Sequence, residues 1–499
     1  MGDNETLTTT TARGGMYVLV RRVSANAIRI GALAILARKL TTAEFGVVAL
    51  AQMAAALLTV FGSGGIITYV LCDREPDWQD RVNPAFWLNV ALTVASCLIA
   101  VACVPIVHVV YHDWVVDRVL LLILATYFIT QFRMVPEALL QRKLRFRALA
   151  VRDTARDFLS AGATVGMALA GMGVWSLVVP NLLVAPLDVF ITVGLARFWP
   201  HAALGRDQWP RIFKFTKNVM GEQLLTFVGN EADTAVVGKV MGDAVLGVYD
   251  LAYQLANLIG RNVSSVLTMV STPSLATAYE RKTGIGAPYR KMMRVLSFVS
   301  TPLLLGMFVL AEELVHVVYG GQWTAAVPLL RILIISTLVR SVTSPSGVIF
   351  NVVGRPELSM QTALWFVAFY VPALVLTSRT GDIVDVTLCV SACRVAIGLL
   401  SLYISLEVIA ESKLRVTVEL MRPLLAGGIM TGVTWYANHA LATVGWPVVV
   451  RIFAITALGG AIYFIAMTVI SKRAVQEALV VFKALISRKR SAPRATETT

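Results

Sequence analysis

The stretch that decides the fold is Asn218–Val240, which reads NVMGEQLLTFVGNEADTAVVGKV. It is long enough to cross a bilayer, because about 20 helical residues span the hydrocarbon core. With about 100° between successive residues, one face of such a helix carries Asn218, Glu222, Thr226, Gly229 and Asp233. Charged side chains inside lipid are costly, so this face must turn toward protein or water.

The composition places the chain in a membrane. Of its 499 residues, 57% are hydrophobic and 15% are charged, and the mean hydropathy is +0.72. A soluble domain cannot bury so many apolar side chains, since ordinary apolar usage is about 45–50% even when glycine is counted. We therefore predict an all-α polytopic membrane protein. The five cysteines show no CxxC spacing, which indicates neither a metal site nor disulfides.

Apolar runs of spanning length recur along the whole sequence. They lie roughly at residues 16–37, 46–71, 85–110, 119–138, 155–172, 174–196, 217–238, 244–272, 295–318, 325–351, 359–377, 382–409, 416–438 and 446–470. Each run is long enough for one transmembrane helix, so the pattern predicts about fourteen spans. The fifth and sixth runs are separated only at Gly171–Gly173.

The charges between the predicted spans give the orientation. With the N-terminus in the cytoplasm, the inside loops and the C-terminal tail collect most of the Lys and Arg residues, above all between Arg142 and Arg156. The outside loops hold only Arg38, Lys39, Arg118, Lys239 and Arg379. Basic residues mark cytoplasmic loops, so both termini are predicted to be cytoplasmic. The same bias explains the net charge of +14, so no nucleic-acid partner is expected.

The sequence repeats itself. The pentapeptide VHVVY occurs at Val107–Tyr111 and again at Val315–Tyr319. Ala43–Ala51 (AEFGVVALA) resembles Ala244–Ala252 (AVLGVYDLA) at an offset of 201 residues. Further matched pairs are Trp114 and Trp323, Leu120–Leu121 and Leu329–Leu330, and Pro136 and Pro345. A duplication of six spans predicts two pseudo-symmetric lobes related by an axis along the membrane normal.

These features divide the chain into six parts. They are a disordered cytoplasmic N-terminus (1–15), an N-lobe of six spans (16–198), a cytoplasmic linker (199–216), a C-lobe of six spans (217–411), two further spans (412–471) and a basic amphipathic tail (472–499).

The predicted first span is the basic counterpart of the opening stretch. Arg22, Asn26 and Arg29 share one helix face at the spacing i, i+4, i+7. Guanidinium groups bind phosphate oxygens in pairs and stay charged inside a pocket. The candidate phosphate-binding residues within the spans are Arg22, Arg29, Arg261, Arg331 and Arg340. The alternative is that each arginine neutralises a buried carboxylate, for example Arg29 with Glu222 or Asp233.

The acidic face of the opening stretch also has two interpretations. Glu222 and Asp233 act as counter-ions of the arginines, or they bind a coupling H⁺ or Na⁺ in a polar cavity with Asn26 and Thr226. Burial raises and a nearby arginine lowers a carboxyl pKa, so the sequence leaves both readings open. Apart from such an ion, we expect no cofactor. The repeat-related His108 and His316 are structural or form a proton relay.

Catalysis is not expected. The outside loops are short, the longest lying around residues 438–446, whereas membrane glycosyltransferases and ligases need a sizeable outer loop or domain with acid and base groups. The histidines form no metal-ligand cluster and no HExxH motif, and the chain has no phosphate-binding loop for ATP. We predict a protein that is not an enzyme.

Several local motifs resemble a known family. They are LTTAEFGV at Leu40–Val47, NPAFWLN at Asn83–Asn89, QRKLRF at Gln141–Phe146, GMGVWSL at Gly171–Leu177 and GRP at Gly354–Pro356. With two six-helix lobes, two further spans and charged first helices, the chain resembles the polysaccharide exporters of the multidrug/oligosaccharidyl-lipid/polysaccharide exporter superfamily. The resemblance covers roughly residues 15–475 and is greatest to the colanic-acid and lipopolysaccharide exporter branch.

The resemblance implies a flippase of the bacterial inner membrane. Such a protein moves polyprenyl-pyrophosphate-linked oligosaccharide from the cytoplasmic to the outer leaflet by alternating access. Basic cavity residues hold the pyrophosphate, and Arg22 and Arg29 fit this role by position. The expected partners are this substrate, membrane lipids, and a polymerase and glycosyltransferases of the same pathway. The alternatives are a drug/cation antiporter of the same fold, which the arginines disfavour, or a polymerase, ligase or scaffold of a polysaccharide synthesis complex.

Overall fold

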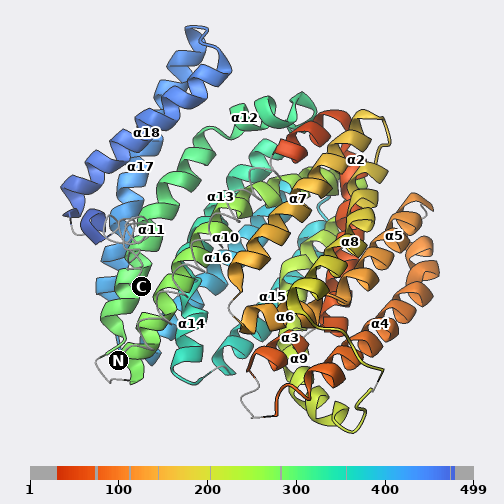
Figure 1. Cartoon of the computed structure of the whole chain (residues 1–499). Coiled ribbons are helices and arrows are strands. Elements are labelled where there is room, and N and C mark those ends of the chain that lie inside the picture. Colours follow the sequence, from red (N-terminus) through yellow and green to blue (C-terminus); the bar gives the residue numbers. More distant parts are fainter. Residues whose placement is uncertain are drawn as a thin grey trace, which may run out of the picture. The chain divides into compact units, whose positions relative to one another are not determined.

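The structure is a computed structural model, and it describes residues 31–63, 65–72, 77–111, 114–143, 145–202, 204–280, 284–355, 357–472 and 474–477. Within these ranges the regular structure is helical and no strand occurs, so the predicted all-α class is confirmed (Figure 1). Ten of the described helical stretches are long and apolar enough to cross a membrane.

The helices follow the predicted spans. Residues 31–39 are helical, and then come α2 (Thr42–Ser63), α3 (Ile66–Cys72), α4 (Val82–Tyr111), α5 (Trp114–Gln131), α6 (Met134–Arg142), α7 (Phe146–Leu169) and α8 (Trp175–Ala196). The second half contains α9 (Trp209–Met241), α10 (Asp243–Glu280), α11 (Gly286–Val309), α12 (Ala311–Leu314), the π-helix η1 (Val315–Tyr319), the 3-10 turn η2 (Gly321–Trp323), α13 (Ala326–Thr343), α14 (Pro345–Val352), α15 (Glu357–Ser378), α16 (Ile383–Val408), α17 (Lys413–Thr443) and α18 (Val448–Ile470). Each predicted span from the second to the fourteenth thus coincides with one helix or with consecutive helices, and most of the first span lies outside the described residues.

Glycines end the helices where the sequence predicts a break. Between α7 and α8, Gly171 and Gly173 have φ angles of 77° and 55°, a left-handed conformation that favours glycine. The predicted linker is shorter than expected, because α9 already begins at Trp209. Pro210 lies in its first turn, where a missing N–H costs no helical hydrogen bond. The segment from Trp209 to Thr216 therefore belongs to the helix, not to the linker.

The fourth and tenth predicted spans are broken at matching places. The fourth consists of α5 and the 9-residue α6, and the tenth consists of α13 and the 8-residue α14. Pro136 is the third residue of α6 and Pro345 is the first residue of α14. Proline cannot donate the hydrogen bond of a helix interior and clashes with the preceding turn, so both spans restart beside it. The proline pair that indicated the duplication therefore has the same structural effect in both halves.

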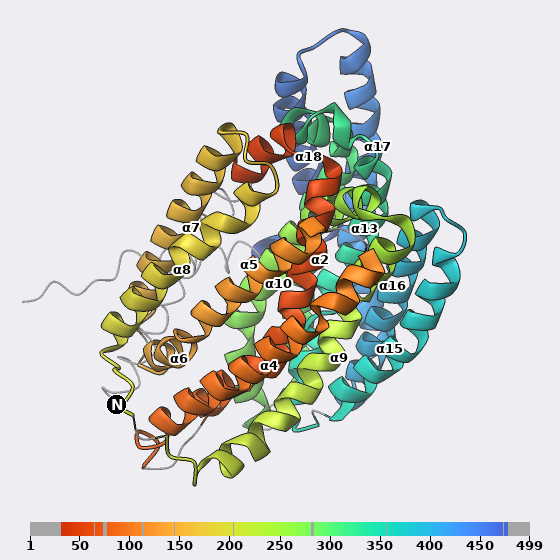
Figure 2. The same ribbon diagram turned by 90° about the vertical axis from the view of Figure 1, so that its right-hand side faces the viewer.

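The chain forms two compact units. Unit 1 contains residues 1–251, 318–326 and 363–390, and unit 2 contains residues 252–317, 327–362 and 391–499. In unit 1, α2 packs against α4, α5 and α9, and α8 packs against α5 and α7. Figure 2 shows α7 and α8 side by side. Val47, Val48 and Ala51 of α2 lie in a buried cluster with Val119 of α5 and Val178 of α8.

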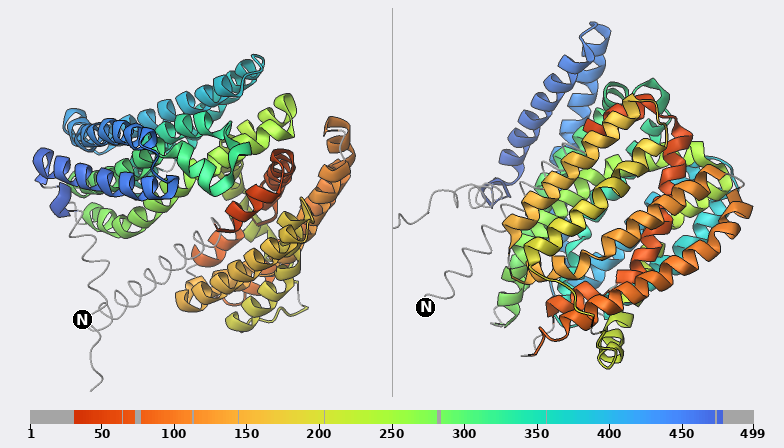
Figure 3. Two further views of the ribbon diagram at one scale, coloured as in Figure 1. Left: turned by 90° about the horizontal axis from the view of Figure 1, so that it is seen from above. Right: turned by 45° about the vertical axis from the view of Figure 1, so that its right-hand side comes forward.

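In unit 2, α11 and the two C-terminal helices pack together. α17 runs beside α18 and also contacts α11 (Figure 3). The Tyr463 hydroxyl of α18 donates a 3.0 Å hydrogen bond to the Phe298 carbonyl of α11. Ala426, Met430 and Met467 are buried in the core of this group. The outward surfaces of α17 and α18 expose large apolar side chains such as Phe453 and Val469, as expected for helices in lipid.

Candidate functional site

The two matched segments of the repeat contact one another through glycines. A Cβ atom at Gly46 of α2 would overlap the Asp243 carbonyl of α10, and a Cβ at Gly247 of α10 would overlap the Thr42 carbonyl of α2. The repeat offset of 201 residues relates Thr42 to Asp243 and Gly46 to Gly247. The contact is therefore a reciprocal helix crossing, which we call the glycine crossing. It brings the backbones of the two repeats into direct contact within unit 1.

A tryptophan of the second repeat closes over the start of α2. Trp323 is fully buried, donates a 2.8 Å hydrogen bond to the Ala37 carbonyl, and meets the Phe45 ring edge-on at 5.0 Å. Its repeat partner Trp114 is 67% exposed, and its ring centroid lies 4.3 Å from that of His108, with the two ring planes tilted by 44°. The matched tryptophans therefore have different environments, although the sequences of the two repeats are similar around them.

His108 forms a pair with a buried carboxylate. Its Nδ1 lies 2.7 Å from Oδ2 of Asp117, whose side chain is almost fully buried. The second copy of the VHVVY motif forms η1, whereas the first copy ends α4. The structural and the relay interpretations of His108 both stay predictions.

The predicted acidic face of α9 divides between two environments. Glu222 and Thr226 are exposed, and Thr226 donates a hydrogen bond to the Glu222 carbonyl at 3.0 Å. Asp233 is buried and accepts a hydrogen bond from the Tyr249 hydroxyl of α10. Gly229 faces the Phe366 ring of α15. The structure therefore gives Asp233 a neutral hydrogen-bond donor.

The described part of the structure does not bring the predicted phosphate-binding arginines together. Arg22, Asn26 and Arg29 lie outside them, as does the side chain of Arg261. Arg340 is exposed on α13. Arg331 lies over the Trp435 ring at 4.9 Å and over the adjacent Phe308 ring at 5.9 Å, so its neighbours are aromatic. The phosphate-binding role of these residues stays a prediction.

A buried ion network lies where no site was predicted. It joins the start of α6, the first half of α7, and α8. Its members are Arg133, Glu137, Arg152, Asp153, Arg156, Asp157 and Asp188. We call these residues the N-lobe ion network.

Arg152 holds the N-lobe ion network together. Its side chain is 2% exposed, its Nε donates to Asp153 Oδ1 at 2.9 Å, and its Nη2 lies 3.3 Å from Glu137 Oε2. It also donates to the Thr192 hydroxyl at 2.8 Å. Asp188, likewise 2% exposed, lies within 4 Å of three arginines. Such buried charges are stable only when they are paired, so each member depends on the others.

The sequence carried a signal for this network. Arg152-Asp153 and Arg156-Asp157 repeat the same pair four residues apart, a spacing that places them on one helix face. Asp188 is the one charged residue of the run 174–196. The arginines were assigned to a cytoplasmic loop because the predicted span began at residue 155, whereas α7 begins at Phe146.

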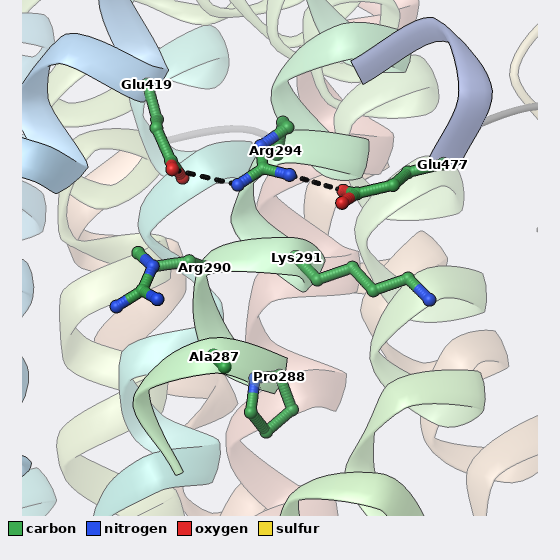
Figure 4. Close-up of a pocket in the computed structure, with 7 residues that line it drawn as sticks. All are labelled: Ala287, Pro288, Arg290, Lys291, Arg294, Glu419 and Glu477. Carbon is green, nitrogen blue, oxygen red and sulfur yellow. Dashed lines mark hydrogen bonds and ion pairs between the residues drawn. The ribbon is translucent and has the colours of Figure 1, made fainter. Parts of the chain in front are cut away.

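A second charged cluster fastens the C-terminal segment to unit 2. Arg294 of α11 bridges Glu419 of α17 at 2.8 Å and Glu477 beyond α18 at 2.6 Å (Figure 4). A cavity of about 380 Å³ lies beside this bridge and is also lined by Arg290 and Lys291. In Figure 4 these two side chains point away from each other. Their charges therefore do not converge on one ligand, and the bridge acts as a clasp between helices.

The described residues thus build an all-helical, polytopic membrane protein with ionic interactions buried inside its bundles. A sequence profile of the family described as "Polysaccharide biosynthesis protein" matches residues 35–328, so the chain belongs to this family. The predicted resemblance to polysaccharide exporters is confirmed.

Curated relatives cover most of the chain. The "Lipopolysaccharide biosynthesis protein WzxC" of Escherichia coli (strain K12) is 21% identical over 409 residues, which cover 81% of this chain and 82% of that protein. The "Succinoglycan biosynthesis transport protein ExoT" of Rhizobium meliloti (strain 1021) is 26% identical over 304 residues, covering 60% of this chain and 61% of that protein.

The solved structures show which fold this is. The structure titled "Lipid II flippase MurJ, inward closed conformation" matches with a TM-score of 0.76 at 10% identity and covers 93% of this chain and 99% of its own. An inward-facing multidrug resistance MATE family transporter of the MOP superfamily matches with a TM-score of 0.52 at 13% identity, covering 81% and 95%. The chain therefore has the fold shared by these transporters.

Proposed function

We propose that this protein is a flippase that moves polyprenyl-pyrophosphate-linked oligosaccharide from the cytoplasmic to the outer leaflet. The observation that carries the proposal is membership of the polysaccharide biosynthesis family together with a flippase fold over 93% of the chain. Relatives named for lipopolysaccharide biosynthesis and succinoglycan transport support exopolysaccharide or lipopolysaccharide synthesis as the pathway. A drug/cation antiporter is the second candidate, and the lower TM-score of the multidrug transporter makes it the weaker one.

The flippase works in the bacterial inner membrane with both termini in the cytoplasm. The excess of basic residues in the loops assigned to the inside supports this orientation. The substrate head enters a polar cavity while its polyprenyl tail stays in lipid, and the repeats alternate between inward and outward access. A polymerase and glycosyltransferases of the same pathway are its functional partners.

The activity is tested in vesicles that contain the purified protein. The substrate is the lipid-linked oligosaccharide extracted from the source strain after deletion of this gene, in which it accumulates. An impermeant periodate treatment then oxidises only the sugars in the outer leaflet of the vesicles. We expect the inner-leaflet pool to become accessible faster in these vesicles than in protein-free ones, and equal rates would refute the proposal.

The pyrophosphate is bound by Arg22 and Arg29. Guanidinium groups hold phosphate oxygens through two parallel hydrogen bonds, which supports arginine over lysine for this role. The double substitution Arg22→Ala and Arg29→Ala should abolish flipping at equal expression, while Arg147→Ala, in an exposed residue of α7, serves as the comparison. Normal polymer export by the double variant would contradict the assignment.

A coupling H⁺ or Na⁺ is bound at Glu222 or Asp233. The exposure of Glu222 and the burial of Asp233 beside a hydroxyl support two carboxylates that differ in their access to ions. Collapse of the ion gradient across the vesicles should slow flipping by the native protein. An unchanged rate would exclude both residues as coupling sites.

A further inference from the structure

Unit 1 contains a polar cavity of about 380 Å³ between α2, α5, α7 and α8. This volume lies within the range of about 300–1,000 Å³ that is typical of small-ligand sites. Its wall carries amide and hydroxyl groups from all four helices, namely Gln52, Thr126, Ser160 and Asn181. Arg133 and Asp188 of the N-lobe ion network line the same cavity. The cavity therefore joins the ion network to a surface of neutral polar groups.

Arg133 and Asp188 bring charge to the wall of the cavity, but one buried atom of each is closed off from it. The Nε of Arg133 lies 3.4 Å from Asp188 Oδ2, and Asp188 Oδ1 lies 3.5 Å from the Nε of Arg152, but neither contact is a hydrogen bond. The side chains of Arg133 and Asp188 are only 15% and 2% exposed. The Arg133 Nε and Asp188 Oδ1 atoms have almost no accessible surface, so a ligand in the cavity bonds to the neutral polar groups of its wall instead.

The accessible end of the cavity is also polar. Ser160 of α7 donates a 2.7 Å hydrogen bond to the Oδ1 of Asn181 of α8, and Asn181 and Gln52 are both exposed. Exposed amides within helices of spanning length are unfavourable against lipid. They therefore face an aqueous space that continues into the cavity.

The charges of the network favour a neutral ligand. Three arginines and four carboxylates lie in it, and they are already paired with one another. A cation entering the cavity would meet Arg133 and Arg156, and an anion would meet Asp157 and Asp188. A hydroxyl group can accept from one side and donate to the other without a net charge. The lining thus matches a polyhydroxylated molecule better than an ion.

We propose that this cavity binds a sugar residue of the lipid-linked oligosaccharide. Its hydroxyls exchange hydrogen bonds with Gln52, Ser160 and Asn181, which line the cavity. This inference rests on the proposed flippase activity. It places recognition of the sugar in unit 1, apart from the arginines proposed for the pyrophosphate.

The test compares two ligands on the full-length protein. The first is the oligosaccharide released from its lipid by mild acid, and the second is the sugar-free polyprenyl pyrophosphate. Gln52→Leu and Asn181→Leu should each weaken binding of the released oligosaccharide, by roughly two- to tenfold for each lost hydrogen bond. Binding of polyprenyl pyrophosphate should be unchanged. Thr456→Val is the control, because this exposed hydroxyl of α18 bonds only to its own helix, at the Ile452 carbonyl.

The outcomes separate this inference from the flippase proposal. If the native protein does not flip the substrate, the proposed function fails. If it flips, but Gln52→Leu and Asn181→Leu bind the oligosaccharide as the native protein does, the cavity holds only water and the sugar site is refuted. If these two variants bind the oligosaccharide normally but respond differently to the ion gradient, the cavity is an ion site. That result would also refute the sugar site. Asp188→Asn is a further variant, but the two leucine variants leave the ion network intact and decide the question.

Discussion

At the scale of single residues, the most demanding feature is the burial of Arg152 and Asp188 inside a helical bundle. Each charge is stable only because its neighbours compensate it. The acidic members of the N-lobe ion network outnumber the arginines, so the loss of one arginine leaves carboxylates without partners.

We therefore expect Arg152→Met to lower the free energy of unfolding by about 3–5 kcal/mol, as when one partner of a buried pair is removed. Thermal unfolding of the purified protein in detergent should show a clear drop in Tm. Arg147→Met is the matched control, because Arg147 lies on the same helix and is exposed. Equal Tm values for the two variants would show that the network does not stabilise the fold.

Residue-scale features divide into those the sequence predicted and those it could not predict. The exposed Glu222 and the buried Asp233 were both identified as special because charges in an apolar run are costly. The partners of Arg152 were not predicted, since Thr192 lies 40 residues away and is reached only when α7 and α8 pack. The tyrosine that donates to Asp233 was missed for the same reason.

At the scale of elements, the glycine crossing depends on two residues that have no side chain. Gly46 and Gly247 each lie against a backbone carbonyl, which cannot move aside as a flexible side chain can. The adjoining helices α2 and α10 would have to separate to admit even one methyl group.

Gly46→Ala and Gly247→Ala should each destabilise the protein by about 1–3 kcal/mol through overpacking. Gly194→Ala is the control, because Gly194 lies in α8 with no atom near its virtual Cβ. Alanine is the better helix former, so the control should be neutral or stabilised by up to about 1 kcal/mol. The three variants are compared by their Tm in detergent. A lowered Tm for Gly194→Ala alone would contradict the glycine crossing.

Helix ends were predicted best where the chemistry is local. The α7–α8 turn at Gly171 and Gly173, and the restarts of α6 and α14 beside proline, follow from the conformational limits of these residues. The start of α9 at Trp209 was missed because the basic residues before the span were interpreted as a loop. Such residues can extend a helix into the interface, since their charged ends reach water.

At the scale of the whole molecule, the distribution of charge predicts the orientation in the membrane. We expect a cysteine introduced at Lys143 to react with an impermeant maleimide only from the cytoplasmic side, and one at Arg118 only from the outside. Both positions are exposed. The background must lack the native cysteines, because Cys103 is itself exposed. Labelling of both positions from one side would refute the predicted topology.

The duplication was the most informative prediction about the whole molecule. It relied on matched motifs, and the paired breaks at Pro136 and Pro345 and the glycine crossing now give it structural support. The compact units could not be foreseen in the same way, because α9 belongs to unit 1 although it opens the predicted C-lobe. Sequence similarity locates repeated segments, but it does not tell which side chains they contact.

The glycine crossing also bears on how the protein arose. If the two halves descend from one shorter chain that paired with a copy of itself, a single ancestral glycine made both contacts now made by Gly46 and Gly247. Any mutation of that codon altered both sides of the pair at once. After the genes fused, each glycine became separately mutable, yet each still faces the other copy's carbonyl. Both positions are therefore expected to retain glycine in descendants whose neighbouring residues have diverged freely.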